Sequence, residues 1–285
     1  MIYETKEKLK KRELKKLNIW CENNKFYELD WFKLLTGFVN LKYNNKTICQ
    51  DSNYCYLGIK SLTKDDLTLE EFFDFVMENS NQYFLSNRIN NTLFKVLFNE
   101  LALFFIARAK ENHIEAFVHL YRIIEKMSIM FPLLYFKQSS NFKNVYKDVQ
   151  LLMQKETGAL TFYKNFQETI FSEKAFLDNS IFFNFFVEKE EECRELKLIY
   201  ENLFNKKSFG ISFINNNTLV VPFGRIIDFA VTIRNRYFHL SMEHSFNIEP
   251  IEMDMNLFFA SINDNILNWI GVVYYEMFKI LNKKL

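Results

Sequence analysis

Glycine and proline are scarce in this sequence, with 6 and 3 residues among 285. Proteins built from many short strands need both residues at their turns, whereas long helices joined by few turns do not. The chain also holds 33 Phe and 14 Tyr, which supply bulky side chains for a core. We therefore expect an all-α fold in one or two domains, since a chain of this length can bury one large core or two modest ones.

Cysteine and histidine are also few, with 4 of each. No two cysteines have the C-x-x-C spacing, and no cluster of His and Cys has the spacing of a zinc site. Nucleotide-binding glycine loops and the G-x-S-x-G and H-E-x-x-H patterns are absent too, which argues against ATPases, α/β-hydrolases and zinc proteases. The sequence predicts a reduced, cytoplasmic protein, and we expect neither a metal nor a cofactor.

Long hydrophobic runs are missing. The most apolar stretch, residues 101–107, is too short to cross a bilayer, and the charges near the N-terminus do not suit a signal peptide. We therefore expect no membrane span. The formal net charge of +1 gives no global attraction to nucleic acid, so an RNA contact must come from a local basic patch. One patch lies in residues 6–16, which we interpret as a solvated amphipathic helix with Leu9 and Leu17 on its inner side.

Two regions are predicted along the chain: an N-terminal accessory region, residues 1–85, and a helical domain, residues 86–285. In the first region, residues 26–59 mix aromatic residues with Asn and Thr, and we expect an irregular segment with short strands there. Thr68 and Glu71 have the spacing of a helix capping box. A helix should begin at this point and run to about Met77.

The helical domain shows a strong helical period. Its apolar residues recur every three or four positions in four runs: Phe94, Leu97, Phe98, Leu101, Phe104 and Phe105; Phe117, Leu120, Tyr121, Ile124, Met127 and Phe131; Ile226, Phe229, Ala230, Ile233 and Tyr237; and Phe259, Ile262, Ile266, Ile270, Val273 and Met277. The break at residues 110–113 is short, so the first two helices should form an antiparallel hairpin. We expect Pro132 to end the second helix.

An insertion interrupts this domain at about residues 141–221. The residues Cys193, Leu196, Tyr200 and Leu203 indicate an amphipathic helix, and residues 211–221 alternate around three Asn residues, which predicts a short β-hairpin. We interpret the Phe-rich stretch at residues 182–186 as core or interface. Pro222 then stands where a first-turn proline opens a helix.

One cluster is dense in chemically useful side chains: Arg234, Asn235, Arg236 and His239, at the end of the helix that begins near Pro222. Asn235 and His239 are one helical turn apart and share a face. Arg234 and His239 would point about 140° apart on an ideal helix. Either the helix unwinds near Phe238, or a second copy of the chain supplies the missing partner.

These residue types suit RNA cleavage without a metal. A histidine titrates close to neutral pH and can move a proton to or from the 2′-OH or the leaving 5′-oxygen. The forked, always charged guanidinium of Arg234 suits the non-bridging phosphate oxygens, and Asn235 could orient the phosphate or His239. The competing interpretation is structural, because basic residues and His at a helix C-terminus also satisfy its last carbonyls and its dipole.

The pattern Arg234, Asn235, three residues, His239 resembles the signature of the HEPN superfamily of small helical domains. An amphipathic helix leads into the motif, a loop follows it and a long terminal helix closes the domain, as in that family. Residues 121–125, Tyr-Arg-Ile-Ile-Glu, look like the acidic helix of some members. The resemblance covers roughly residues 90–285, and it implies a HEPN-like helical bundle elaborated by the insertion.

The resemblance also implies an activity: metal-independent endoribonuclease, acting on RNA in a homodimer whose two motifs face each other. Arg234, Asn235 and His239 would be catalytic, Glu125 would support the site by holding Arg234, and Arg236 and Tyr237 would bind RNA. Many such proteins act in antiphage defence or as toxins, so an inhibitor or an activating partner protein is expected.

Two other functions remain open. The bundle could be a non-catalytic dimerisation or interaction module within a defence complex, or a nucleotide-sensing or effector subunit of such a complex. Most of the remaining candidates have ordinary explanations: Arg122 and Glu125 could form a surface ion pair, His113 lies in an expected turn, and His119 has no metal-binding partner on its helix face, so we interpret it as structural. His244 follows the motif in a loop beside Glu243, where it could touch substrate, although we favour a structural role.

Overall fold

The structure of the protein is a computed structural model. It describes residues 27–44, 46–48, 52–62, 68–86, 91–138, 145–147, 149–150, 158–171, 177, 179–185, 194, 197–201, 210–215, 218–238, 248 and 254–282. The basic segment at residues 6–16 and His244 lie outside the described residues. So does most of the helix expected around Cys193, of which only residues 194 and 197–201 are described, all of them as helical.

Most of the described chain is helical, with two small antiparallel sheets. The long helices are α4 (Leu69–Ser86), α5 (Asn91–Ala109), α6 (His113–Gln138) and α11 (Met255–Asn282). Shorter ones are α2 (Tyr27–Leu35), α3 (Tyr54–Leu62), α8 (Ala159–Phe171) and α10 (Ile226–Phe238). The expectation of a helical protein is therefore confirmed for the larger part of the described chain.

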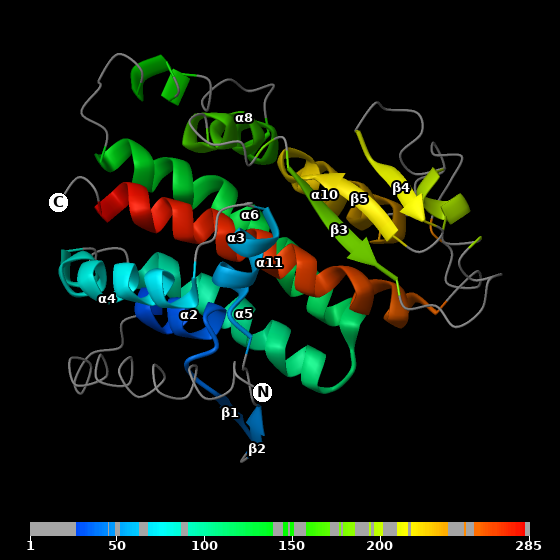
Figure 1. Ribbon diagram of the computed structural model, residues 1–285, viewed down its shortest axis with the longest axis horizontal. Helices are drawn as coiled ribbons and strands as arrows, with labels where there is room; N and C mark the ends of the chain where they lie inside the picture. Colours follow the sequence, from blue (N-terminus) through cyan, green and yellow to red (C-terminus); the bar gives the residue numbers. More distant parts are fainter. Residues whose placement is uncertain are drawn as a thin grey trace.

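Helix α11 is the centre of the fold. It crosses the molecule lengthwise and packs against α3, α4, α6 and strand β3 (Figure 1). From Trp269 to Phe278 every residue of α11 is buried, so this stretch touches protein on all sides. The residues expected on its core face, from Phe259 to Met277, are all buried. A helix that is apolar around its whole circumference belongs in the middle of a protein, and this one lies there.

Helices α5 and α6 form the expected hairpin and pack against each other along their length. Residues 110–112 join them, with Glu111 at a φ of 58° in the turn. Pro132 does not end α6, which continues to Gln138 with the proline inside it. The expectation was wrong because Phe131 and Leu134 are buried on either side of Pro132, and their burial offsets the one backbone hydrogen bond that the proline removes.

The N-terminal part of the described chain is more regular than expected. Residues 26–59 contain the expected short strands, β1 (Leu41–Tyr43) and β2 (Lys46–Ile48), but also α2 and the first part of α3. Helix α2 ends at Leu35 and is followed by Gly37, whose φ is 71°, while the N–H of Phe38 donates to the carbonyl of Lys33. This Schellman motif fixes the end of the helix. The capping box at Thr68 and Glu71 is confirmed, but α4 runs to Ser86 and not to Met77.

The expected hairpin is part of a three-stranded sheet. Strands β4 (Ser212–Asn215) and β5 (Thr218–Pro222) form the hairpin, and β3 (Ser180–Asn184) pairs antiparallel with the other edge of β5. Phe183 of β3 is buried and Phe182 beside it is half-exposed, as the period of a strand requires. The part of the Phe-rich stretch that lies in β3 thus has one core face, and the Asn265 side chain of α11 donates a hydrogen bond to the Phe182 carbonyl at 3.2 Å.

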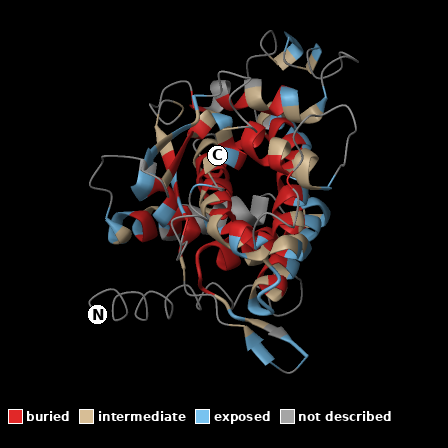
Figure 2. Ribbon diagram, turned by 90° about the vertical axis from the view of Figure 1, so that its right-hand side faces the viewer, coloured by how far each residue is buried: buried red, intermediate tan, exposed pale blue. Residues whose placement is uncertain are grey.

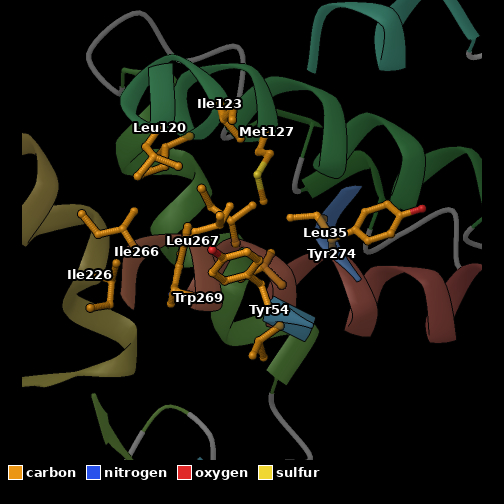
Figure 3. Packing of buried hydrophobic residues seen from close by; sticks show 14 of the residues in the cluster. Leu35, Tyr54, Leu120, Ile123, Met127, Ile226, Ile266, Leu267, Trp269 and Tyr274 are labelled. Atoms are coloured by element: carbon orange, nitrogen blue, oxygen red, sulfur yellow. The ribbon is translucent and has the colours of Figure 1, made fainter. Parts of the chain in front are cut away.

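One continuous core joins these elements. Buried residues lie on the inward-facing sides of the helices and exposed residues lie on the outside (Figure 2). Leu120, Ile123 and Met127 of α6 converge with Ile266, Leu267 and Trp269 of α11, and Ile226 of α10 reaches the same cluster (Figure 3). Residues of α2, α3 and α4 belong to it too. This core fixes α10 relative to α6, which positions the candidate site.

Candidate functional site

Helix α10 carries the motif residues on its last turn. Pro222 ends strand β5 and is followed by a 3-10 turn, η3 (Phe223–Arg225), which leads into α10. The expected core residues Ile226, Phe229, Ala230 and Ile233 are buried, and Tyr237 is half-buried. Asp228 of the first turn pairs with Lys164 of α8. These contacts fix the direction of α10, and hence the place of its C-terminal end.

Arg234 is held by two neighbours. Its guanidinium lies over the ring of Tyr121 on α6, with the two centres 5.3 Å apart. Its Nη1 atom donates a hydrogen bond to Oδ1 of Asn235 at 3.0 Å. A cation above an aromatic face is attracted by the negative charge of the ring face. Asn235 therefore contacts Arg234 directly, and together with Tyr121 it limits where the guanidinium can point.

Arg234 lines a surface pocket of about 230 Å³ between α6 and α10. The pocket is lined by Phe117, Val118, Tyr121, Arg122, Glu125, Arg234 and Phe238. Phe117 and Phe238 have nearly parallel rings, with centroids 6.4 Å apart, and Phe259 of α11 lies behind them. Phe117 and Tyr121 are buried, while Phe238 is 39% exposed. The pocket thus combines aromatic walls with charged side chains.

Two of the charged side chains at the pocket come from α6. Arg122 is half-exposed, and its guanidinium lies 3.9 Å from the carboxylate of Glu100, so it does not form the expected pair with Glu125. Glu125 lines the pocket three residues further on. Among the described residues, no ion pair joins Glu125 to Arg234. The carboxylate and the Arg234 guanidinium share the pocket without touching each other.

Burial raises the pKa of the Tyr121 hydroxyl above its usual value, the nearby Glu125 carboxylate raises it further, and Arg234 opposes both. The phenol therefore remains protonated at neutral pH. Since it holds its proton there, Tyr121 is suited to support Arg234 with its ring and not to accept a proton from a substrate.

The structure places the other predicted residues differently. Tyr237 packs edge-on against Phe259, with ring centroids 5.1 Å apart, and burial raises the pKa of its hydroxyl. The Arg236 carbonyl accepts a hydrogen bond from the backbone N–H of Ile248 at 3.1 Å. Neither residue lines the pocket. His239 follows Phe238 in the sequence and lies outside the described residues.

The described histidines have structural contacts. His119 is buried, and its Nδ1 atom lies 2.7 Å from the Glu100 carboxylate, which fits the structural interpretation. His113 is the first residue of α6, and its backbone N–H donates to the Asn256 side chain at 2.7 Å. Within the described ranges, no three side chains of His, Cys, Asp or Glu gather closely enough to hold a metal ion.

Sequence reasoning missed the aromatic half of the site. The helical period assigns Phe117 and Tyr121 to the core face of their helix, and it gives Phe238 no part in the site. A signal was present, because Phe117 and Tyr121 are four residues apart, as are Arg234 and Phe238, so each pair shares a helix face. Nothing in the sequence indicated that these two faces would meet.

Comparisons of the chain with protein-family models, with curated proteins and with solved structures found no match. The resemblance to the HEPN superfamily therefore rests on the motif and its helical setting. In the described part of the chain, no helix combines the length and the apolar character that a bilayer crossing requires.

Proposed function

We propose that the protein is a metal-independent endoribonuclease that cleaves RNA through attack of the 2′-OH on the adjacent phosphate. The observation that carries this proposal is the position of Arg234, which lies over Tyr121, donates a hydrogen bond to Asn235 and lines a pocket with aromatic walls. A guanidinium held in place before the substrate arrives stabilises developing phosphate charge without reorganisation. Aromatic walls beside it suit a nucleobase.

In this mechanism Arg234 binds the non-bridging oxygens of the scissile phosphate. His239 moves protons, accepting one from the 2′-OH or donating one to the leaving 5′-oxygen. The 2′-oxygen forms a bond to phosphorus as the bond between phosphorus and the leaving 5′-oxygen breaks. The products are a 2′,3′-cyclic phosphate and a 5′-hydroxyl. The 2′-OH is the nucleophile, so RNA and not DNA is the substrate.

A homodimer would complete the site, since one acid and one base are needed and each copy carries one His239. We further propose that the enzyme acts in the cytoplasm, in antiphage defence or as a toxin, under the control of an inhibitor or activating partner. These parts of the proposal rest on the resemblance.

The test is to incubate the full chain with RNA in excess EDTA and to analyse the ends of the fragments. We expect cleavage to continue and to leave 2′,3′-cyclic phosphates. Arg234→Ala and His239→Ala should each lower the rate about a hundredfold or more, because charge stabilisers and acid–base groups contribute at least that much. Glu115→Gln, on the outer side of α6, is the matched control and should cut like the wild type.

Two outcomes would contradict the proposal. Loss of cleavage in chelator, restored by magnesium or manganese, would replace it with a metal-dependent mechanism. A folded wild-type chain that leaves every RNA intact would favour the non-catalytic interaction module.

A further inference from the structure

The Glu125 carboxylate has an unusual position in the pocket. The backbone carbonyl of Glu125 accepts a hydrogen bond from the Ser128 hydroxyl at 2.7 Å. The Glu125 side chain lines the pocket, and among the described residues it forms no hydrogen bond or ion pair. An ionised carboxylate is a pure acceptor with two oxygens in one plane. Glu125 therefore offers two adjacent acceptors to a ligand that carries two adjacent N–H donors.

Arg122 presents the opposite chemistry on the same side of α6. It precedes Glu125 by three residues, so both side chains lie on one face of the helix, and both line the pocket. Its guanidinium is half-exposed and lies 3.9 Å from Glu100, which leaves several of its five donors for a ligand. The pocket thus has acceptors and donors next to each other.

Phe238 supplies an apolar wall. It is 39% exposed although its neighbours Phe117 and Phe259 are buried, so part of its surface is available within the pocket. Aromatic side chains beside arginines are typical platforms for unpaired bases. The volume of about 230 Å³ lies below that of pockets for drug-sized ligands, which suits one base and not several.

We infer that this pocket binds one unpaired guanine base of single-stranded RNA, next to the phosphate that is cut; the inference rests on the proposed function. Guanine presents two parallel donors, N1–H and the 2-amino group, which match the two oxygens of Glu125. Its O6 accepts from Arg122. Adenine and cytosine present an amino donor beside an acceptor, and uracil presents a single donor between two carbonyls.

This assignment also defines the form of the RNA. The Watson–Crick edge of a paired guanine is occupied by cytosine, so the base must be unpaired and turned outward to reach Glu125. The substrate class is therefore RNA with an accessible guanine in a loop, a bulge or a single strand.

The experiment measures binding separately from cleavage. Four 2′-O-methyl oligonucleotides, which cannot react, carry a single G, A, C or U in a fixed context of U residues. Their affinities for the full chain are measured by fluorescence anisotropy. The matching unmodified RNAs are then used for cleavage. We expect the G oligonucleotide to bind at least about tenfold more tightly than the others, as bidentate base contacts allow.

Two variants locate the preference. Glu125→Gln replaces one acceptor with a donor and should remove the preference for G, while binding of the other three oligonucleotides changes little. Phe238→Ala should weaken all four about tenfold, because stacking does not depend on the base. Glu115→Gln, also on α6 but outside the pocket, is the control. Melting temperatures show whether each variant is folded.

The outcomes separate the two proposals. Tight binding of G without any cleavage would contradict the ribonuclease and leave the guanine pocket standing. Equal affinity for all four oligonucleotides, or an unchanged preference in Glu125→Gln, would overturn the pocket assignment. If Glu125→Gln slowed cleavage of all four RNAs equally, Glu125 would be positioning Arg234 instead. Free guanosine monophosphate binding as tightly as the oligonucleotide would assign the pocket to a nucleotide and not to RNA.

Discussion

The guanidinium of Arg234 lies 5.3 Å above the ring of Tyr121, so a residue of α6 sets the position of a charge carried by α10. Such a contact is worth roughly 0.5–2 kcal/mol, depending on how well it is shielded from water. This is little for the stability of the whole fold but enough to select one orientation of a flexible arginine. The Tyr121 ring therefore restricts the position of the Arg234 guanidinium.

The first prediction follows from this contact. Tyr121→Leu keeps an apolar side chain but removes the aromatic face, so Arg234 should lose its preferred orientation and cleavage should slow about tenfold or more. Tyr121→Phe keeps the ring and should stay within about twofold of the wild type, because the protonated hydroxyl is not expected to move protons. Single-turnover rates on one RNA check both variants. Equal rates for Leu and Phe would show that the ring does not position Arg234.

The second prediction concerns the crossing of α3 and α11. A Cβ atom on Gly271 would lie 2.9 Å from the backbone of Tyr54 and Cys55, which cannot move aside as a side chain could. Gly271→Ala should therefore lower the free energy of unfolding by about 1–3 kcal/mol. Gly158→Ala is the control, since no atom lies within 4 Å of its Cβ position. That change should cost less than about 1 kcal/mol, because Gly158 stands at the start of α8, where Ala caps slightly worse.

Urea unfolding of the wild type, Gly271→Ala and Gly158→Ala, at equal protein concentration, measures the three free energies of unfolding. If Gly271→Ala were as stable as the wild type, α3 and α11 could not cross as closely as the structure has them.

Much of the helical framework could be predicted from the sequence, because it is encoded locally. The apolar period of residues 94–131 and 259–277 determines which face of each helix is buried, and the capping box at Thr68 marks the start of α4. The end of α6 could not be predicted, since continuation past Pro132 depends on burial that other helices provide. Strand β3 was missed for a similar reason: its pairing partner β5 lies more than thirty residues away.

The site shows the same division. The motif alone makes Arg234 and Asn235 candidates, and the hydrogen bond between them is local. Tyr121, Arg122 and Phe238 complete the pocket only because α6 and α10 meet, and the pattern within either helix does not encode that meeting. The motif itself could equally have capped a helix end.

The third prediction concerns pH. Burial and, to a smaller extent, Arg108 lower the pKa of His113, against the opposite effects of Asp264 and Glu111. The unfolded chain, with a His pKa near 6.5, binds a proton before the folded chain does. The free energy of unfolding should therefore fall as the pH drops below about 6.5 towards the lower folded pKa.

Urea unfolding at a series of pH values between 7.5 and 5 checks this effect. His113→Gln cannot take up the proton, so its stability should depend less on pH in that window. Identical pH dependence in both chains would assign the acid sensitivity to another group.

The last prediction concerns the dimer. If one active site needs His239 from both copies, a wild-type subunit paired with a His239→Ala subunit has no complete acid–base pair. In an equal mixture with free exchange, about a quarter of the dimers contain two wild-type subunits, so activity should fall to about a quarter. If the site were complete within one copy, the mixture would retain half of the activity.

The wild-type and variant chains carry different affinity tags, and purification through both tags in succession shows that mixed dimers have formed. The control is the same mixture with Glu115→Gln in place of His239→Ala. It should keep full activity, which would show that subunit exchange itself does not inactivate the protein. Activity that falls only in proportion to the wild-type fraction, in a mixture shown to contain mixed dimers, would mean that each copy cleaves RNA with its own Arg234 and His239.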